Sequence, residues 1–296
     1  MFRCLGLIVG ALAMVSFPDF AAAQAQKAEG RKGAAAAGPA WRLAVQAYTF
    51  NRFTFFEAVD KAKALGLKYI EAYPGQKLSK EKPDVVFHHD MSAEAMKDVQ
   101  AQLEEAGITL VNYGVVDLGK DEAAARKVFV FAKKMGIRTI VSEPDPQTLG
   151  TLDKLAREFA IRVAIHNHPK PSKYWSPESV LDAVTGHSRM IGACADTGHW
   201  PRSGVDPVAA LKSLKGRIVC LHFKDLNELN KREAHDVPWG TGKCDVKAML
   251  AELKEQNFRG VFSIEYEHNW ENSMPEIAEC IKTFHKMAGE LGMKSE

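Results

Sequence analysis

The sequence predicts a single-domain α/β protein built as a (β/α)8 TIM barrel. Between residues 41 and 290, eight short β-rich runs alternate with longer amphipathic runs, and no linker rich in Pro, Gly or Ser interrupts them. Such alternation places parallel strands beside helices, and eight units in about 250 residues is the usual size of this barrel. An open doubly wound sheet is the alternative, although no G-x-G-x-x-G motif follows the first predicted strand.

The predicted elements follow one another in strand and helix pairs. Three of the helical runs end at a glycine, namely Gly66, Gly107 and Gly136, and glycine is a frequent residue just past a helix C-terminus. The predicted strands cover residues 42–48, 68–73, 108–114, 138–143, 162–168, 190–196, 217–223 and 261–267.

Residues 1–23 have the features of an export signal. Arg3 precedes an apolar run from Cys4 to Phe17, and the alanines at 21–23 offer a cleavage site. The apolar run is short for a membrane span, so we expect cleavage after residue 23, with an uncleaved anchor as the alternative. Residues 24–40 then form a low-complexity linker and residues 291–296 a C-terminal tail. The protein is expected in the periplasm or outside the cell.

Charge and cysteine content narrow the classes of partner. The formal net charge is +2, and a nearly neutral chain is poorly suited to an extended phosphate backbone. We therefore expect no nucleic acid as partner, and no membrane once the signal is removed. The cysteines beyond the signal have no close pairs, so neither a disulfide framework nor a Cys-based zinc site is predicted. They are Cys194, Cys220, Cys244 and Cys280.

Four ionisable residues fall at the carboxyl ends of predicted strands, on the face that points into the barrel. Side chains alternate inward and outward along each strand, and active sites of such barrels lie at this end. Three carboxylates so close together would repel one another unless a cation neutralised them. We therefore predict a divalent metal site made of Glu143, Asp196, His222 and Glu265.

The ligand types favour certain metals. One imidazole and three carboxylates without a thiolate suit Mn²⁺, Mg²⁺ or Co²⁺, with further oxygen ligands completing the coordination sphere. Zn²⁺ stays an alternative. Taken singly, each of the four residues also fits a simpler role as a strand-end polar group bonded to a loop.

Further polar residues are expected around the metal site. His166 and His168 share one face at the end of the fifth predicted strand, and His199 follows the strand-end Asp by three residues. Histidines at these positions are candidates for substrate binding. Glu71, inward on the second strand, and Lys224, in the segment LHFKD, are further candidates.

The loop at residues 235–245 is predicted to lie over the same end of the barrel. It contains two glycines beside Trp239. Trp239 is therefore a candidate for a substrate contact in a loop that caps the pocket, and a plain connecting loop is the alternative.

These residues give the chain a resemblance to the xylose isomerase-like TIM-barrel superfamily, often labelled sugar phosphate isomerase/epimerase. The resemblance covers residues 41–290, and the segments HNHPKPSKYW and HDVPWGTG look closest to secreted members. It implies one metal held by Glu143, by Asp196 in DTGH, by His222 in LHFKD and by Glu265 in SIEYE. In the epimerases of the family the two Glu ligands act as acid and base, and the His after the Asp contacts substrate. By resemblance these roles fall on Glu143, Glu265 and His199.

The function predicted on this basis is a metal-dependent sugar isomerase or epimerase, with a carbohydrate as its small-molecule partner. A base removes a proton next to a carbonyl, and the resulting enediolate is reprotonated elsewhere. If a β-leaving group departs instead, the enzyme is a lyase or hydratase of 3-keto-glycosides, which is the alternative. Two further alternatives are a phosphodiesterase related to AP endonucleases and a sugar-binding protein without catalytic activity. Self-association is left open.

Overall fold

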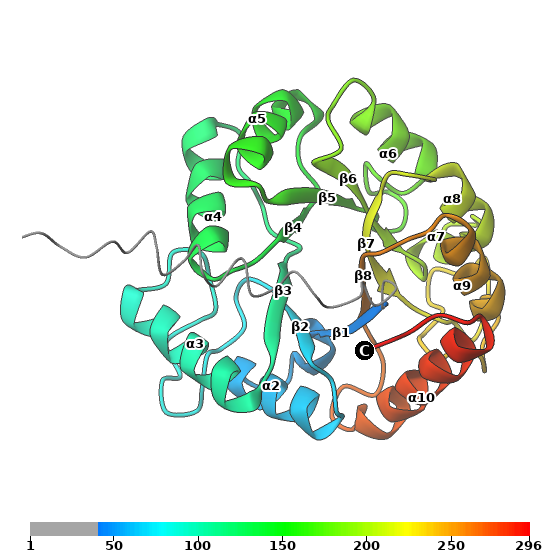
Figure 1. Ribbon diagram of the computed structural model, residues 1–296, viewed down its shortest axis with the longest axis horizontal. Helices are drawn as coiled ribbons and strands as arrows, with labels where there is room; N and C mark the ends of the chain where they lie inside the picture. Colours follow the sequence, from blue (N-terminus) through cyan, green and yellow to red (C-terminus); the bar gives the residue numbers. More distant parts are fainter. Residues whose placement is uncertain (1–40) are drawn as a thin grey trace, which may run out of the picture. The chain divides into compact units, whose positions relative to one another are not determined.

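A computed structural model describes residues 41–296, and the predicted export signal and linker lie outside this range. Within it, parallel strands close into a barrel in the order β1 to β8, which confirms the predicted TIM barrel. Figure 1 shows the strands at the centre of a ring of helices. The strands are β1 (Arg42–Gln46), β2 (Tyr69–Ala72), β3 (Thr109–Tyr113), β4 (Thr139–Ser142), β5 (Arg162–His166), β6 (Ile191–Asp196), β7 (Ile218–Phe223) and β8 (Val261–Ile264).

The helices form because their sequences combine an apolar face with caps at their ends. Thr54 and Glu57 make a reciprocal capping box at the start of the first helix, and Gly107 ends the next one with a left-handed φ of 70°. The helices are α2 (Phe55–Ala64), α3 (Ala93–Ala106), α4 (Glu122–Lys134), α5 (Leu149–Phe159), α6 (Pro177–Val184), α7 (His199–Arg202), α8 (Pro207–Ser213), α9 (Val246–Glu255) and α10 (Met274–Glu290), with 3-10 turns η1 (Ala47–Phe50) and η2 (Pro146–Thr148).

Closure of the barrel depends on the pairing of its first and last strands. Arg42 of β1 lies opposite Val261 of β8, and the register continues to Val45 and Ile264. Every strand therefore has two neighbours and the barrel has no open edge.

Two apolar layers lie on the two sides of the barrel wall. The outer layer fills the space between strands and helices. The inner layer forms a small plug inside the barrel, below the carboxyl ends of the strands. The described cysteines are all buried and unbridged, as expected, and two of them belong to the plug, which consists of Ala44, Val111, Val141, Ala164, Cys194, Val219, Cys220 and Val261.

Several strands end earlier than the sequence predicts. β4 stops at Ser142 and β8 at Ile264, so Glu143 and Glu265 are the first residues beyond their strands. Asp196 is the last residue of β6. The predicted site residues thus lie where the backbone leaves the sheet, above the apolar plug.

The C-terminal residues return to the start of the described chain. The backbone N–H of Trp41 donates to the carbonyl of Lys294 at 2.7 Å, and that of Glu296 donates to the carbonyl of Trp41 at 2.8 Å. The C-terminal segment is therefore paired with the chain just before β1. Within the described range, no helix is both long and apolar enough to cross a membrane.

Candidate metal and sugar site

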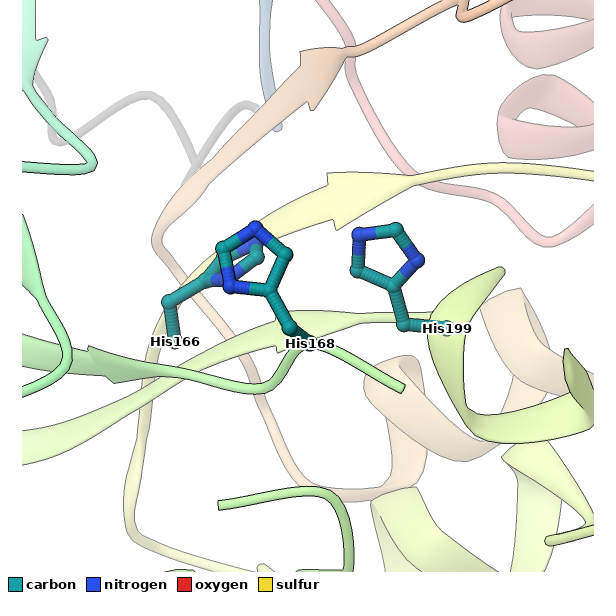
Figure 2. Close-up of side chains that lie close together, drawn as sticks. All are labelled: His166, His168 and His199. Carbon is teal, nitrogen blue, oxygen red and sulfur yellow. The ribbon is translucent and has the colours of Figure 1, made fainter. Parts of the chain in front are cut away.

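The carboxyl ends of the strands bring polar side chains into one cluster. His166, Asp196, His199 and Glu265 each offer one ligand atom, and these atoms all lie within 4.8 Å of one another. His166, His168 and His199 satisfy the same criterion, and Figure 2 shows their rings gathered at the ends of β5 and β6. A group of side chains that could hold a metal ion therefore lies at the strand ends, where the sequence predicts a metal site.

The cluster and the predicted ligand set share Asp196 and Glu265. The two other predicted ligands lie against it. His222 Nδ1 is 3.1 Å from Glu265 Oε2, and Glu143 Oε1 is 3.7 Å from His166 Nδ1. All four predicted ligands are thus close enough to belong to one site, and their coordination of a metal stays a prediction.

His222 is held from below by a buried carboxylate. Its Nε2 lies 2.8 Å from Oε1 of Glu71, and the other oxygen of Glu71 accepts from Ser263 Oγ at 2.6 Å and from Asn112 Nδ2 at 2.9 Å. A carboxylate behind a histidine is the usual arrangement around protein metal sites, because it fixes which ring nitrogen faces the metal. Glu71 has no exposed surface, so it positions His222 instead of lining the pocket as we expected.

Glu143 and His168 form a second pair. Glu143 Oε1 is 2.6 Å from His168 Nδ1, and Oε2 accepts from Ser172 Oγ at 3.0 Å. Burial alone would raise the pKa of Glu143, but the neighbouring imidazoles of His166 and His168 hold it well below the ordinary range. Glu143 is therefore ionised, and it orients the His168 ring.

Lys224 places a buried positive charge among the carboxylates. Its Nζ lies 2.9 Å from Asp196 Oδ2, 2.8 Å from Glu265 Oε2 and 2.7 Å from Glu267 Oε2. Burial would lower the pKa of Lys224, but these carboxylates raise it well above its usual value. The ammonium group thus partly neutralises the acidic cluster.

A pocket of about 260 Å³ opens beside this cluster. Its lining combines polar residues with the rings of Tyr48, Tyr73 and Pro74. His168 and His199, the two histidines expected to meet the substrate, both line it. The complete lining is Gln46, Tyr48, Tyr73, Pro74, Gly114, Val115, His168, His199, Glu265 and Glu267.

A larger pocket of about 440 Å³ lies at the opposite end of the barrel, around Arg162, Arg217 and Arg259. Its lining contains neither a carboxylate nor a histidine. We therefore place the candidate active site in the smaller pocket, where the ionisable groups converge.

The structure corrects the expectation for Trp239, as it does for Glu71, and adds residues that the sequence did not reveal. Trp239 is 1% exposed and packs against Phe223 at a ring distance of 4.9 Å, so it belongs to the core and does not cap the pocket. Glu267 was missed, although it has the same strand parity as Glu265 in SIEYE. Arg202 was also missed, although it follows His199 by one helical turn.

Comparison with known proteins identifies the family of the chain. The family described as "Xylose isomerase-like TIM barrel" matches residues 59–284. The chain belongs to this family. The matched range contains every residue of the metal cluster, and the predicted family is thereby confirmed. The finer expectation of a secreted subgroup stays a prediction.

Three similar proteins illustrate the family. Inosose dehydratase from Clostridium tetani (strain Massachusetts / E88) is 29% identical over 136 residues, which cover 41% of this chain and 45% of that protein. An uncharacterised protein from Parabacteroides distasonis ATCC 8503 has a crystal structure that is 35% identical, with a TM-score of 0.68 and coverage of 83% of this chain and 98% of its own. The IOLI protein, described with a bound zinc atom, is 18% identical, with a TM-score of 0.64 and coverage of 84% and 98%.

The matches to the curated relatives cover only part of those proteins. Matches to the inosose dehydratases of Clostridium tetani and Lactiplantibacillus plantarum span about half of those proteins, 45% and 49% of their lengths. The likeness to the IOLI protein shows the fold alone. The names of these relatives describe dehydratases, and they agree better with the lyase alternative than with the isomerase or epimerase that we expected first.

Proposed function

We propose that this chain is a divalent-metal-dependent lyase that removes a β-hydroxyl or another β-oxygen group from a keto-sugar or a keto-inositol. The observation that carries the proposal is the buried carboxylate of Asp196, which is 0% exposed. Its Oδ2 contacts Lys224 but receives no well-directed hydrogen bond from any residue in the described range. A buried carboxylate oxygen without a hydrogen bond is costly, and a metal ion would satisfy it.

The donor set suits such an ion. Asp196, Glu265 and Glu143 supply carboxylate oxygens, and His222 supplies Nδ1 because its Nε2 faces Glu71. This set of hard ligands favours Mn²⁺, Mg²⁺ or Co²⁺, and Zn²⁺ is also compatible with it. When bound, the ion polarises the substrate carbonyl and stabilises the negative charge that develops beside it.

The protein's own groups move the protons. Glu265 lines the pocket and accepts the proton from the carbon next to the carbonyl. The electrons of that C–H bond form a C=C bond as the C–O bond at the β-carbon breaks. His168 acts in its imidazolium form: Nδ1–H stays on the Glu143 carboxylate, the proton on the other ring nitrogen goes to the departing oxygen, and the ring is left neutral. When the leaving group is a hydroxyl, the products are an enone and water.

The preference for a lyase rests on the relatives. Several curated relatives carry the name inosose dehydratase, and this name supports elimination over isomerisation. The same names give no support to a phosphodiesterase or to a sugar-binding protein without catalytic activity. An isomerase or epimerase would use the same first proton transfer and differ only in where the proton returns.

The test is product analysis with a panel of keto-inositols, free ketoses and 3-keto-glycosides. With added Mn²⁺, we expect an enone and a released hydroxyl or alcohol from at least one β-oxygenated ketone. Glu265→Gln should lower the rate by about 10²- to 10⁴-fold. Formation of an isomeric sugar without release of a leaving group would refute the lyase proposal and restore the isomerase.

We also propose that the protein acts outside the cytoplasm, on the basis of the signal-like residues 1–23. N-terminal sequencing of the protein from the cell envelope and the medium tests this. A mature terminus near residue 24 supports export, and an intact Met1 in the cytoplasmic fraction contradicts it.

A further inference from the structure

Arg202 and His199 lie at the two ends of the short helix α7. One helical turn brings their side chains together, and Arg202 Nη1 is 2.9 Å from His199 Nδ1. The other nitrogen of the ring, Nε2, lies 3.5 Å from Asp196 Oδ2, and His199 lines the pocket. One ring nitrogen therefore faces Arg202, and the other faces the metal cluster.

The chemistry of the two groups fixes a proton. A guanidinium group has only donors, so the Nδ1 that it contacts must accept the hydrogen bond and carries no proton. A neutral imidazole has its single proton on the other nitrogen. The contact with Arg202 therefore places the proton of His199 on Nε2.

The guanidinium group is itself held firmly. Its Nη2 is 3.1 Å from Asp236 Oδ2, its Nη1 is 3.2 Å from Glu267 Oε2, and its Nε donates to the carbonyl of Ala234 at 2.9 Å. The side chain is 8% exposed. Partners on every side leave Arg202 little freedom to turn away from His199.

We propose that Arg202 is a positioning residue that fixes His199 as an Nε2–H donor to an oxygen atom of the substrate and thereby excludes His199 from metal binding. The proposal rests on the function proposed above. A histidine binds a metal through a nitrogen without a proton, and in His199 that nitrogen faces Arg202. The acceptor that the structure places near this N–H is Asp196 Oδ2, at 3.5 Å, so a substrate group that takes its place must also be an acceptor, such as a carbonyl or hydroxyl oxygen.

This inference separates the two ligand sets that the geometry allows. His199 belongs to the compact cluster with His166, Asp196 and Glu265, yet its proton makes it unsuitable as a ligand there. His222 has the opposite arrangement, because Glu71 accepts from its Nε2 and its Nδ1 faces the cluster, 3.1 Å from Glu265 Oε2 and 3.1 Å from His166 Nε2. The proton positions thus favour His222 over His199 as the imidazole ligand.

The test is ¹⁵N NMR of protein labelled at histidine, with His199 assigned by comparison with His199→Gln. In the metal-free and Zn²⁺-loaded wild type, we expect Nε2 to show the shift of a protonated ring nitrogen and Nδ1 that of an unprotonated one. A protonated Nδ1 in either form, or a Zn²⁺-induced loss of the Nε2 proton, would overturn the proposal. This measurement needs no variant of Arg202 that might fail to fold.

Two variants of Arg202 test the same proposal by their activity. Arg202→Met removes the donor and should allow the proton to move to Nδ1, with kcat/KM lower by roughly 10- to 100-fold, as expected for one lost hydrogen bond to the substrate. Arg202→Lys retains a donor and should recover part of the loss. Zn²⁺ affinity should stay unchanged in His199→Gln and fall at least about tenfold in His222→Gln; the reverse order would overturn the proposal.

The outcomes distinguish this inference from the proposed function. A protein that eliminates nothing but keeps the proton of His199 on Nε2 contradicts the lyase and leaves the role of Arg202 standing. An active lyase with the His199 proton on Nδ1 supports the proposed function and contradicts the role of Arg202.

Discussion

His222 Nε2 lies 2.8 Å from Glu71 Oε1 in a part of the barrel that solvent does not reach. This contact links β2 to the proposed metal site, because Glu71 lies on β2 and its bond to Nε2 leaves Nδ1 of His222 facing Glu265. A carboxylate partner of this kind also raises the basicity of the imidazole and makes it a stronger ligand.

Replacing Glu71 with Gln should weaken metal binding without removing a ligand. Loss of such an outer partner typically costs about 10- to 100-fold in metal affinity, and we expect this range for Mn²⁺ measured by calorimetric titration. Glu57→Gln, in the capping box of α2, is the control and should leave the affinity unchanged. Equal affinities in wild type and Glu71→Gln would mean that His222 is not a ligand.

Lys224 and a bound metal should compete for the same oxygens. Removal of one partner of a buried ion pair costs about 3–5 kcal/mol, so Lys224→Met should lose roughly this much free energy of unfolding without metal, as measured by urea titration. Mn²⁺ should stabilise the variant more than the wild type, because no ammonium then occupies Asp196 and Glu265. Lys212→Met on the exposed face of α8 is the control and should behave like the wild type. If Mn²⁺ raised the free energy of unfolding equally in the wild type and in Lys224→Met, the metal and Lys224 would not compete.

The glycine in the DTGH segment leaves room for the stem of Lys224. A Cβ at Gly198 would lie 2.7 Å from Lys224 Cδ and 2.9 Å from its Cβ. Gly198→Ala should therefore displace Lys224 and destabilise the protein by about 1–3 kcal/mol. Gly150→Ala in α5, where a Cβ meets nothing within 4 Å, should be neutral or stabilising. Thermal unfolding of the two variants makes the comparison, and equal melting temperatures would contradict the close approach.

The carboxylate of Glu143 should make stability depend on pH. Its pKa is lowered in the folded protein from the ordinary value of 4.5, so the unfolded chain binds the proton more readily. Its stabilising contribution is then complete above about pH 4.5 and is lost as the pH falls through the lower folded value. Urea unfolding of metal-free wild type and Glu143→Gln should show a stability difference that shrinks as the pH falls below 4.5. A difference independent of pH would show that the contacts with His166 and His168 do not favour the charged form.

The sequence predicts the barrel well because its signals are repeated and local. Each strand and helix has its own apolar periodicity, and the parity of residues along four strands is enough to bring Glu143, Asp196, His222 and Glu265 together. The inward or outward parity of a strand residue does not show how deep inside the barrel its side chain lies. Glu71 has the inward parity of a pocket residue, yet it lies below His222, where only the packing of neighbouring strands could place it.

Loop residues are harder to predict, because their positions depend on contacts between distant segments. Asp236 and Glu267 meet Arg202 from separate loops, and no spacing in the sequence links the three. Trp239 illustrates the opposite error. Two neighbouring glycines suggest a loop that caps the pocket, but the Trp239 ring is large and apolar, and it is buried against Phe223.

The most direct test of the central claim is solvent exchange at the carbon next to the carbonyl. Purified protein is stripped of metal, reloaded with Mn²⁺ or Zn²⁺, and incubated in D₂O with a keto-inositol, with Glu265→Gln as the control. The account predicts deuterium in the recovered ketone or its elimination product only with metal and only in the wild type. No exchange in the metal-loaded wild type across the substrate panel, or equal exchange without metal, would contradict it.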